Sequence, residues 1–237
     1  MPIPIRTELV TPGTDLAQFV GRYVKDVADP GDVVALCESA VAIAQDRAIH
    51  PSEVRPTWLA RFLSRFPHPD GSLATPPAMQ LAMQEAGTGR ILAGAAAAAA
   101  GKLLRRRGWF YHVAGKSLAR IDDIAGTLPP FEGFIVLGPV RMDETVAAVR
   151  AATGLHTAIV DVDDASHVDI LTLTGGITED ELSLALLGNP QGNDDQQTPL
   201  VVLKRLPAAG AARFSVQSKR GSRSQYRPPP VSGRTDS

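Results

Sequence analysis

Short β-branched runs bounded by turn residues are the strongest constraint on how this 237-residue chain folds. Asp32–Cys37 (DVVALC) follows Asp29-Pro30-Gly31, a pattern that indicates a buried strand. Thr157–Val162 and Leu200–Leu203 predict two further strands, and Val168–Leu173 alternates as another. Amphipathic helical patterns lie between these runs. Because strands and helices mix throughout, we expect an α/β fold (mixed α+β) with mixed sheets and flanking helices.

Polar residues at several positions predict where helices begin. Thr14 and Asp143 can each cap a helix, and Thr178 and Glu181 have the spacing of a capping box. Another amphipathic helix is indicated by apolar residues at helical spacing before two prolines, namely Trp58, Leu59, Phe62, Leu63 and Phe66. We expect these side chains to form its apolar face.

An alanine-rich segment, Ile91–Leu104, is the best candidate for a membrane span. It is too short and too rich in alanine, because a bilayer requires roughly 20 strongly apolar residues. We therefore expect a buried helix in a soluble protein with no membrane association. The N-terminus does not resemble a signal peptide, and Cys37 has no partner for a disulfide, so we expect a cytoplasmic location.

The charge of the chain is unevenly distributed. Residues 207–237 contain six basic residues and one acidic residue, which leaves 18 bases and 24 acids in residues 1–206. The segment 207–237 is rich in Pro, Gly, Ser and Arg, so we predict a disordered tail behind a folded body of residues 1–206, with a subdomain break near residues 105–110. The tail is either a solvated extension, which we favour, or an arm for a polyanion; salt-dependent nucleic-acid binding by the chain with and without it distinguishes the two.

The common catalytic motifs are not matched. Gly115-Lys116-Ser117 does not have the preceding glycine of a P-loop, and the histidines do not have the spacing of a zinc site. Acidic residues do lie at the ends of predicted strands: Asp122-Asp123 follow one, and Asp161, Asp163 and Asp164 lie at the end of another. Carboxylates at strand ends could hold Mg²⁺ or Mn²⁺, although aspartates in such turns more often simply face solvent.

Several segments, taken in order, resemble the coenzyme F420:L-glutamate ligase-like family (F420-0:gamma-glutamyl ligase), and the similarity covers most of residues 4–206. The segments that carry it are Leu9–Leu16 (LVTPGTDL), Gly31–Val34, Cys37–Val41, Leu137–Pro139, Ala158–Asp161, Asp180–Gly188 and Thr198–Val202.

The resemblance implies a GTP-dependent ligase that forms an amide bond through an acyl phosphate, with Mg²⁺ or Mn²⁺ as cofactor. Its small-molecule substrates would be a deazaflavin and glutamate, and the family dimerises, so a homodimer is expected. Carried over onto this chain, the metal ligands fall on Asp122 and Asp161, whereas no catalytic side chain is assigned. The nucleotide-contacting positions fall on Glu8, Leu9, Val10, Glu38 and Ser39.

The chain departs from the family at positions where polar contacts to the nucleotide are expected. Those positions hold Ile43, Ala125, Val162 and Asn189. A non-catalytic member that binds a small ligand or a protein partner is therefore the alternative to a divergent ligase, and nucleic-acid binding through the tail is a minor alternative.

Overall fold

The structure is a computed structural model, and it describes residues 1–67, 72–103, 130–163, 167–192 and 196–204, with residues 113, 115 and 121. The chain divides into two units, Met1–Arg205 and Leu206–Ser237. The second unit, with the predicted tail, lies outside the described residues. So do Asp122, Ala125 and the region of the predicted subdomain break.

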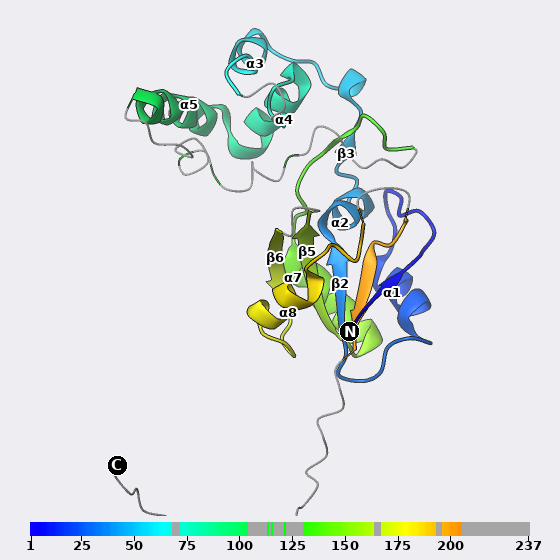
Figure 1. Cartoon of the computed structure of the whole chain (residues 1–237). Coiled ribbons are helices and arrows are strands. Elements are labelled where there is room, and N and C mark those ends of the chain that lie inside the picture. Colours follow the sequence, from blue (N-terminus) through cyan, green and yellow to red (C-terminus); the bar gives the residue numbers. More distant parts are fainter. Residues whose placement is uncertain are drawn as a thin grey trace, which may run out of the picture. The chain divides into compact units, whose positions relative to one another are not determined.

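A five-stranded mixed sheet forms the centre of the first unit, in the order β1-β7-β2-β5-β6 (Figure 1). Its strands are β1 (Pro2–Ile5), β2 (Val33–Cys37), β5 (His156–Val162), β6 (Val168–Leu173) and β7 (Leu200–Leu203). Only β2 and β5 pair in parallel, whereas β7 runs antiparallel to both β1 and β2, and β6 runs antiparallel to β5. The sheet combines parallel and antiparallel pairs with helices, which confirms the α/β class.

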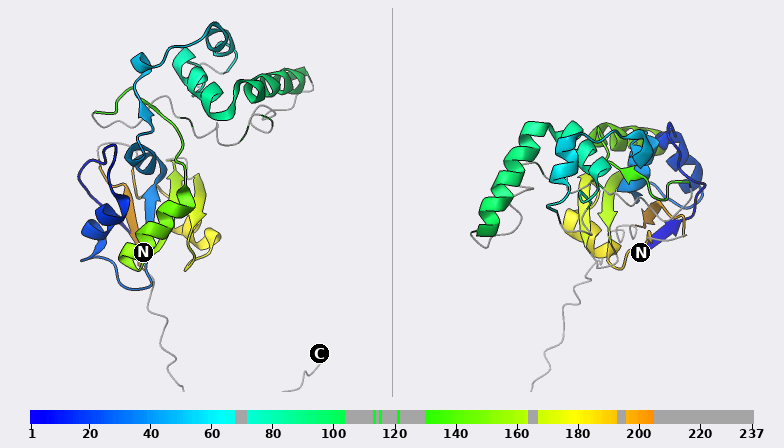
Figure 2. Two further views of the ribbon diagram at one scale, coloured as in Figure 1. Left: turned by 180° about the vertical axis from the view of Figure 1, so that it is seen from behind. Right: turned by 90° about the horizontal axis from the view of Figure 1, so that it is seen from above.

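Both faces of the sheet are covered, because successive side chains of a strand point to opposite faces. Val34 and Leu36 of β2 belong to a core shared with α1 (Leu16–Val24) and α7 (Met142–Thr153). Val33 and Ala35 point the other way, into a core shared with α8 (Glu179–Leu186). The strands are buried on both sides, which explains why their sequences are nearly continuous apolar runs. Figure 2 shows α1 and α7 on the face seen from behind.

A further hydrophobic core, separate from the two that cover the sheet, belongs to the helical part of the unit. It lies among α3 (Trp58–Leu63), α4 (Pro76–Ala86) and α5 (Thr88–Leu103), with contributions from β3 (Ala48–Ile49) and β4 (Ile135–Val136), which pair with each other. Arg47 joins these elements, since its Nε donates to the carbonyl oxygen of Gly138 at 2.6 Å and its Nη2 lies 2.6 Å from the Glu85 carboxylate. A short 3-10 helix, Pro51–Glu53, precedes α3, and α2 (Glu38–Ala44) follows β2 directly.

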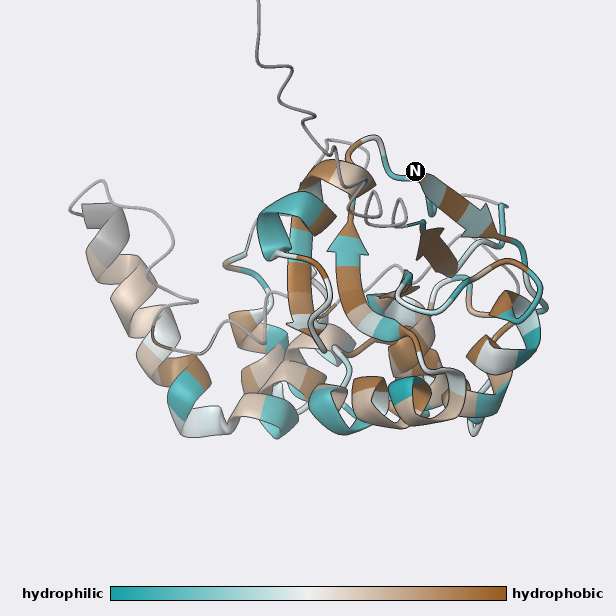
Figure 3. Ribbon diagram, turned by 90° about the horizontal axis from the view of Figure 1, so that it is seen from below, coloured by the Kyte–Doolittle hydropathy of each residue, from teal (hydrophilic) through white to brown (hydrophobic). Residues whose placement is uncertain are grey.

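The prediction of a buried alanine-rich helix is wrong. Within residues 88–100 of α5 only Ile91 and Gly94 are buried, and Leu92 is 43% exposed. Figure 3 shows this helix mostly in pale brown, the colour of moderately hydrophobic residues. Alanine has little side-chain surface to bury, so the helix contacts the core only near its first turns. No helix in the described part of the chain is long and apolar enough to cross a membrane.

The apolar face predicted for the helix at residues 58–66 is confirmed only in part, because Leu63 is buried and Leu59 packs against the helical core whereas the aromatic side chains do not. The side chains that α3 buries in the helical core are Ala60 and Leu63. Trp58, Phe62 and Phe66 instead lie on the exposed side, with exposed fractions of 77%, 49% and 69%.

The helix caps are confirmed in one case out of three. Thr178 and Glu181 form the predicted capping box at the start of α8. Asp15, rather than Thr14, caps α1, because its carboxylate accepts from the N–H groups of Ala17 and Gln18. The N-cap of α7 is Arg141, in a left-handed conformation, whereas the Asp143 carboxylate accepts a hydrogen bond from the Thr172 hydroxyl at 2.6 Å.

One ion pair joins the end of β7 to the loop before β2. The Lys204 ammonium lies 2.6 Å from the Asp29 carboxylate and 3.0 Å from that of Asp32, which is buried. Hydrogen bonds from Lys204 to Asp29 and then Asp32 raise the pKa of the lysine above its ordinary value. The pair therefore favours the charged form of Lys204 in the folded chain.

Candidate functional site

The strand order gathers most of the predicted site residues at one edge of the sheet. β2 and β5 are parallel, and β1 runs in the same direction because both β1 and β2 are antiparallel to β7. All three strands therefore end at the same edge, which we call the carboxyl edge. Ligands of open α/β sheets commonly bind outside this edge. Since neighbouring strands lie about 4.8 Å apart, the ends of β1 and β2 are separated by about 10 Å.

The segment that leaves β1 carries Glu8, Leu9 and Val10. The Glu8 N–H donates to the Tyr23 hydroxyl at 2.9 Å, and its carboxylate lies 2.7 Å from Arg22. Val10 is buried in the core, and Leu9 is half-buried. Contacts with α1 therefore hold this segment in place, while the Glu8 carboxylate remains at the surface.

Cys37, Glu38 and Ser39 lie where β2 passes into α2 (Figure 1). Glu38 is buried, with 7% of its surface exposed, and Ser39 is half-buried. Burial raises the pKa of the Cys37 thiol, hydrogen bonds from the backbone of Ala40 and Ser39 oppose this shift, and the carboxylates of Asp161 and Glu38 add to it. The thiol therefore stays protonated at neutral pH, which disfavours a nucleophilic role.

Asp161 is exposed and lies close to the end of β5, near the Cys37 thiol whose pKa it influences. Its partner on β6 is Asp169, which is also exposed. Directly opposed side chains in an antiparallel pair have Cβ atoms about 4.5–5.5 Å apart, and two like charges there are destabilising. A divalent cation bound by the carboxylate oxygens would remove that repulsion, so this pair fits the donor chemistry of Mg²⁺ or Mn²⁺.

The other predicted metal ligand, Asp122, lies outside the described residues, so its distance from Asp161 stays untested. Among the residues that are described, no group of three or more His, Cys, Asp or Glu side chains is arranged to hold a metal ion. Asp161 and Asp169 thus supply two carboxylates, and a site with a third protein ligand would require Asp122 or another residue of the undescribed segments.

Three of the four substituted family positions, Ile43, Val162 and Asn189, lie within the described residues. Ile43 packs against the core beneath α1 and α7, and Val162 is 8% exposed within the core beneath α8. Asn189 is buried in a left-handed conformation, and its Oδ1 accepts from the Gly192 N–H at 3.2 Å. Hydrophobic packing and a turn therefore occupy positions where the family places nucleotide contacts.

Sequence reasoning missed two polar residues near the same edge, Gln191 and Thr198. The Gln191 Nε2 donates to the carbonyl oxygen of Pro199 at 3.2 Å, and the Thr198 hydroxyl donates to the Gln191 carbonyl. They precede β7, whose first residue, Leu200, pairs with Leu36 near the end of β2. Gln191 and Thr198 reach this edge because β7 pairs antiparallel with β2. No local sequence motif could therefore have identified them as residues near the site.

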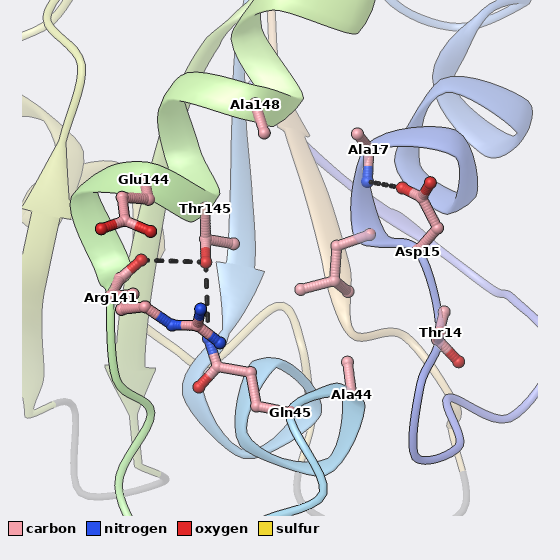
Figure 4. Close-up of a pocket in the computed structure, with 10 residues that line it drawn as sticks. Thr14, Asp15, Ala17, Ala44, Gln45, Arg141, Glu144, Thr145 and Ala148 are labelled. Carbon is pink, nitrogen blue, oxygen red and sulfur yellow. Dashed lines mark hydrogen bonds between the residues drawn. The ribbon is translucent and has the colours of Figure 1, made fainter.

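A cavity of about 280 Å³ lies between α1, α2 and α7 (Figure 4). Its lining comes from the first turns of α1 and α7 and from the end of α2. Two charged residues line it on the α7 side, namely Glu144 of the helix and Arg141, the N-cap of the helix. The Gln45 Nε2 donates to the Thr145 hydroxyl at 3.4 Å, and that hydroxyl donates to the Arg141 carbonyl at 3.1 Å. Ligand cavities usually exceed about 300 Å³, so this one suits a small polar group rather than a whole nucleotide.

Comparison with known proteins places the family resemblance in the first part of the chain. Residues 4–88 match the model of the family F420-0:Gamma-glutamyl ligase. No curated protein matches the chain. The matched segment extends from β1 through α4, so it contains Glu8–Val10, Glu38 and Ser39 but not Asp161. The resemblance to the F420-0:gamma-glutamyl ligase family is therefore confirmed over residues 4–88, and for the resembling segments after residue 88 it stays a prediction.

Proposed function

We propose that this chain is a divergent coenzyme F420-0:L-glutamate ligase-like enzyme that uses GTP and Mg²⁺ or Mn²⁺. The family match supports a ligase-like function, and the observation that carries the finer proposal is the strand order. That order brings Glu8–Val10, Glu38, Ser39 and Asp161 to the carboxyl edge, although Glu8 and Asp161 are 153 residues apart in the sequence. Homodimer formation and a cytoplasmic location are further predictions of the resemblance and the composition.

The proposed reaction has two steps. A carboxylate oxygen of the deazaflavin substrate attacks the γ-phosphorus of GTP, and GDP leaves, which gives an acyl phosphate. The amine of glutamate then attacks the acyl carbon, inorganic phosphate leaves, and the amine gives up a proton as the amide forms. The acyl phosphate makes this possible, because phosphate is a far better leaving group than the hydroxide of a free acid.

The chain's own residues would bind and orient the reactants. Asp161, with Asp122 and with Asp169 opposite it, would hold the divalent ion, which neutralises charge on the transferring phosphoryl group when bound. Ser39 can donate a hydrogen bond to a phosphate oxygen from its hydroxyl. The backbone of Glu8–Val10, held by Tyr23 and Arg22, would position the nucleotide.

A non-catalytic scaffold is the second candidate, and one observation favours it specifically. The side chains of Ile43 and Val162 both pack in hydrophobic cores, so neither position can supply a polar contact to a nucleotide. A protein of this kind would bind a small ligand or a protein partner at the carboxyl edge without transferring glutamate.

The test measures nucleotide binding and glutamyl transfer in parallel. GTP is titrated into the full chain by calorimetry with Mg²⁺, with Mn²⁺ and with EDTA, and glutamate addition to the deazaflavin is followed by mass spectrometry. We expect metal-dependent binding and transfer, both lost in Asp161→Asn and kept in the matched control Asp26→Asn, which removes an exposed carboxylate after α1. Binding without transfer would support the scaffold instead. Absence of metal-dependent binding would contradict the ligase proposal.

A further inference from the structure

The exposed side of α3 and the turn after it form an apolar surface with positive charge. Trp58, Phe62 and Phe66, which we call the aromatic face, follow one another at intervals of four residues and are 77%, 49% and 69% exposed. Taking 150–250 Å² for each aromatic side chain, they present roughly 400 Å² to solvent. Patches of this size on a monomer often mark an interaction site.

Arginines surround the aromatic face. Arg55, Arg61 and Arg65 are all exposed, and none of them forms an ion pair with a residue in the described ranges. Phe62 and Phe66 pack against each other edge-to-face, with ring centroids 5.1 Å apart and an interplanar angle of 74°. The face therefore suits a partner that offers aliphatic side chains together with negative charge.

The chain itself carries such a surface on α8. Leu184 and Leu187 are 70% and 50% exposed, and Glu179 and Asp180 are exposed in the first turn of the same helix. We call these four residues the acidic face. The acidic face complements the aromatic face in both hydrophobicity and charge. It offers leucines that can pack against aromatic rings and carboxylates that can pair with guanidinium groups.

We propose that the aromatic face of one copy of this chain binds the acidic face of a second copy. The family resemblance implies a homodimer but does not identify its surface; this assignment rests on exposed side chains and does not depend on the proposed enzymatic activity. A stable interface usually buries about 800 Å² per partner, which is more than the aromatic face alone supplies. A twofold dimer satisfies this requirement better than a single contact, because each protomer then contributes both of its faces.

Charge reversal tests the proposal on the full chain by analytical ultracentrifugation. Arg61→Glu with Arg65→Glu, and separately Glu179→Lys with Asp180→Lys, should each weaken self-association about a hundredfold or more, because like charges then face each other. An equimolar mixture of the two double variants should associate again, since both contacts of a mixed dimer regain opposite charges. The matched control, Lys25→Glu with Arg90→Glu, reverses two exposed cations elsewhere and should leave association unchanged. Circular dichroism establishes that every variant is folded.

Three results would overturn the proposal. One is a monomeric wild-type chain at all concentrations, and another is a dimer that the two charge reversals leave intact. The third is a mixture of the two variants that fails to associate although both are folded. If the chain is monomeric but binds vesicles of phosphatidylserine, and Arg61→Glu with Arg65→Glu abolishes that binding, the aromatic face would be assigned to an anionic lipid surface instead.

Discussion

Replacing Asp161 with asparagine should change the stability of the chain in opposite directions with and without a divalent metal. Asp161 and Asp169 are paired directly across β5 and β6, and both are exposed. Cross-strand pairs contribute roughly 0.2–1 kcal/mol, and like charges are unfavourable by a similar amount. In EDTA, Asp161→Asn removes one of the two charges, so the free energy of unfolding should rise by about 0.2–1 kcal/mol.

In excess Mn²⁺ or Mg²⁺ the order should reverse. A ligand present at 100 times its dissociation constant stabilises the folded chain by about 2.7 kcal/mol. The wild-type chain should gain a stabilisation of this order, whereas Asp161→Asn, which retains only one of the two opposed carboxylates, should lose most of it. Asp169→Asn should behave like Asp161→Asn, because the repulsion and the cation binding both require the two carboxylates together.

Urea unfolding followed by circular dichroism measures both effects, with Asp26→Asn as the control for removal of a surface carboxylate. A variant that is less stable than wild type in EDTA would show that the Asp161 carboxylate makes a favourable contact in the folded chain and that repulsion does not dominate. Wild-type unfolding that is insensitive to both metals would refute the cation site itself.

Three further changes test the packing that positions the site. Gln45→Leu should lower the free energy of unfolding by about 1–2 kcal/mol, because the Gln45 amide makes hydrogen bonds of 2.7 and 2.8 Å with both backbone groups of Val140; an unchanged urea midpoint would show that water replaces them fully. Lys204→Met should destabilise the chain at neutral pH. The pKa of Lys204 is raised on folding, so the contribution of this lysine should be complete below pH 10.5 and fade as the pH rises through its folded pKa, a loss that the methionine variant should not show. Leu182→Ala should cost about 2–5 kcal/mol in chemical unfolding, since Leu182 is fully buried between α8 and the sheet; a loss below 1 kcal/mol would mean that the neighbouring side chains collapse into the space.

Local patterns were sufficient to predict four of the five strands of the sheet. The runs that became β2, β5 and β7 are mostly apolar because both faces of the sheet are covered, and this signal does not depend on what covers them. The capping box at Thr178 was predictable for the same reason, because its partner Glu181 is three residues away. The strand β1 gave no such signal, since its PIPI sequence lies at a sheet edge where prolines are tolerated.

Which side of a helix is buried could not be predicted where several sides are apolar. α3 carries apolar residues on two sides, and its burial is decided by α4, which packs against Ala60 and Leu63 and leaves Trp58 and Phe62 in solvent. The alanines of α5 resemble a buried helix in sequence, yet burial needs a neighbouring surface that only the assembled chain provides.

Most elements of this protein, although not β1, and its family resemblance over residues 4–88 were predictable from the sequence, because strand propensity, helix capping and the family pattern are properties of neighbouring residues. Tertiary structure alone decided that Glu8, Glu38 and Asp161 share one edge, since this follows from the order and direction of β1, β2 and β5. It also placed Asp169 opposite Asp161, because strand register brings together side chains that no local pattern connects.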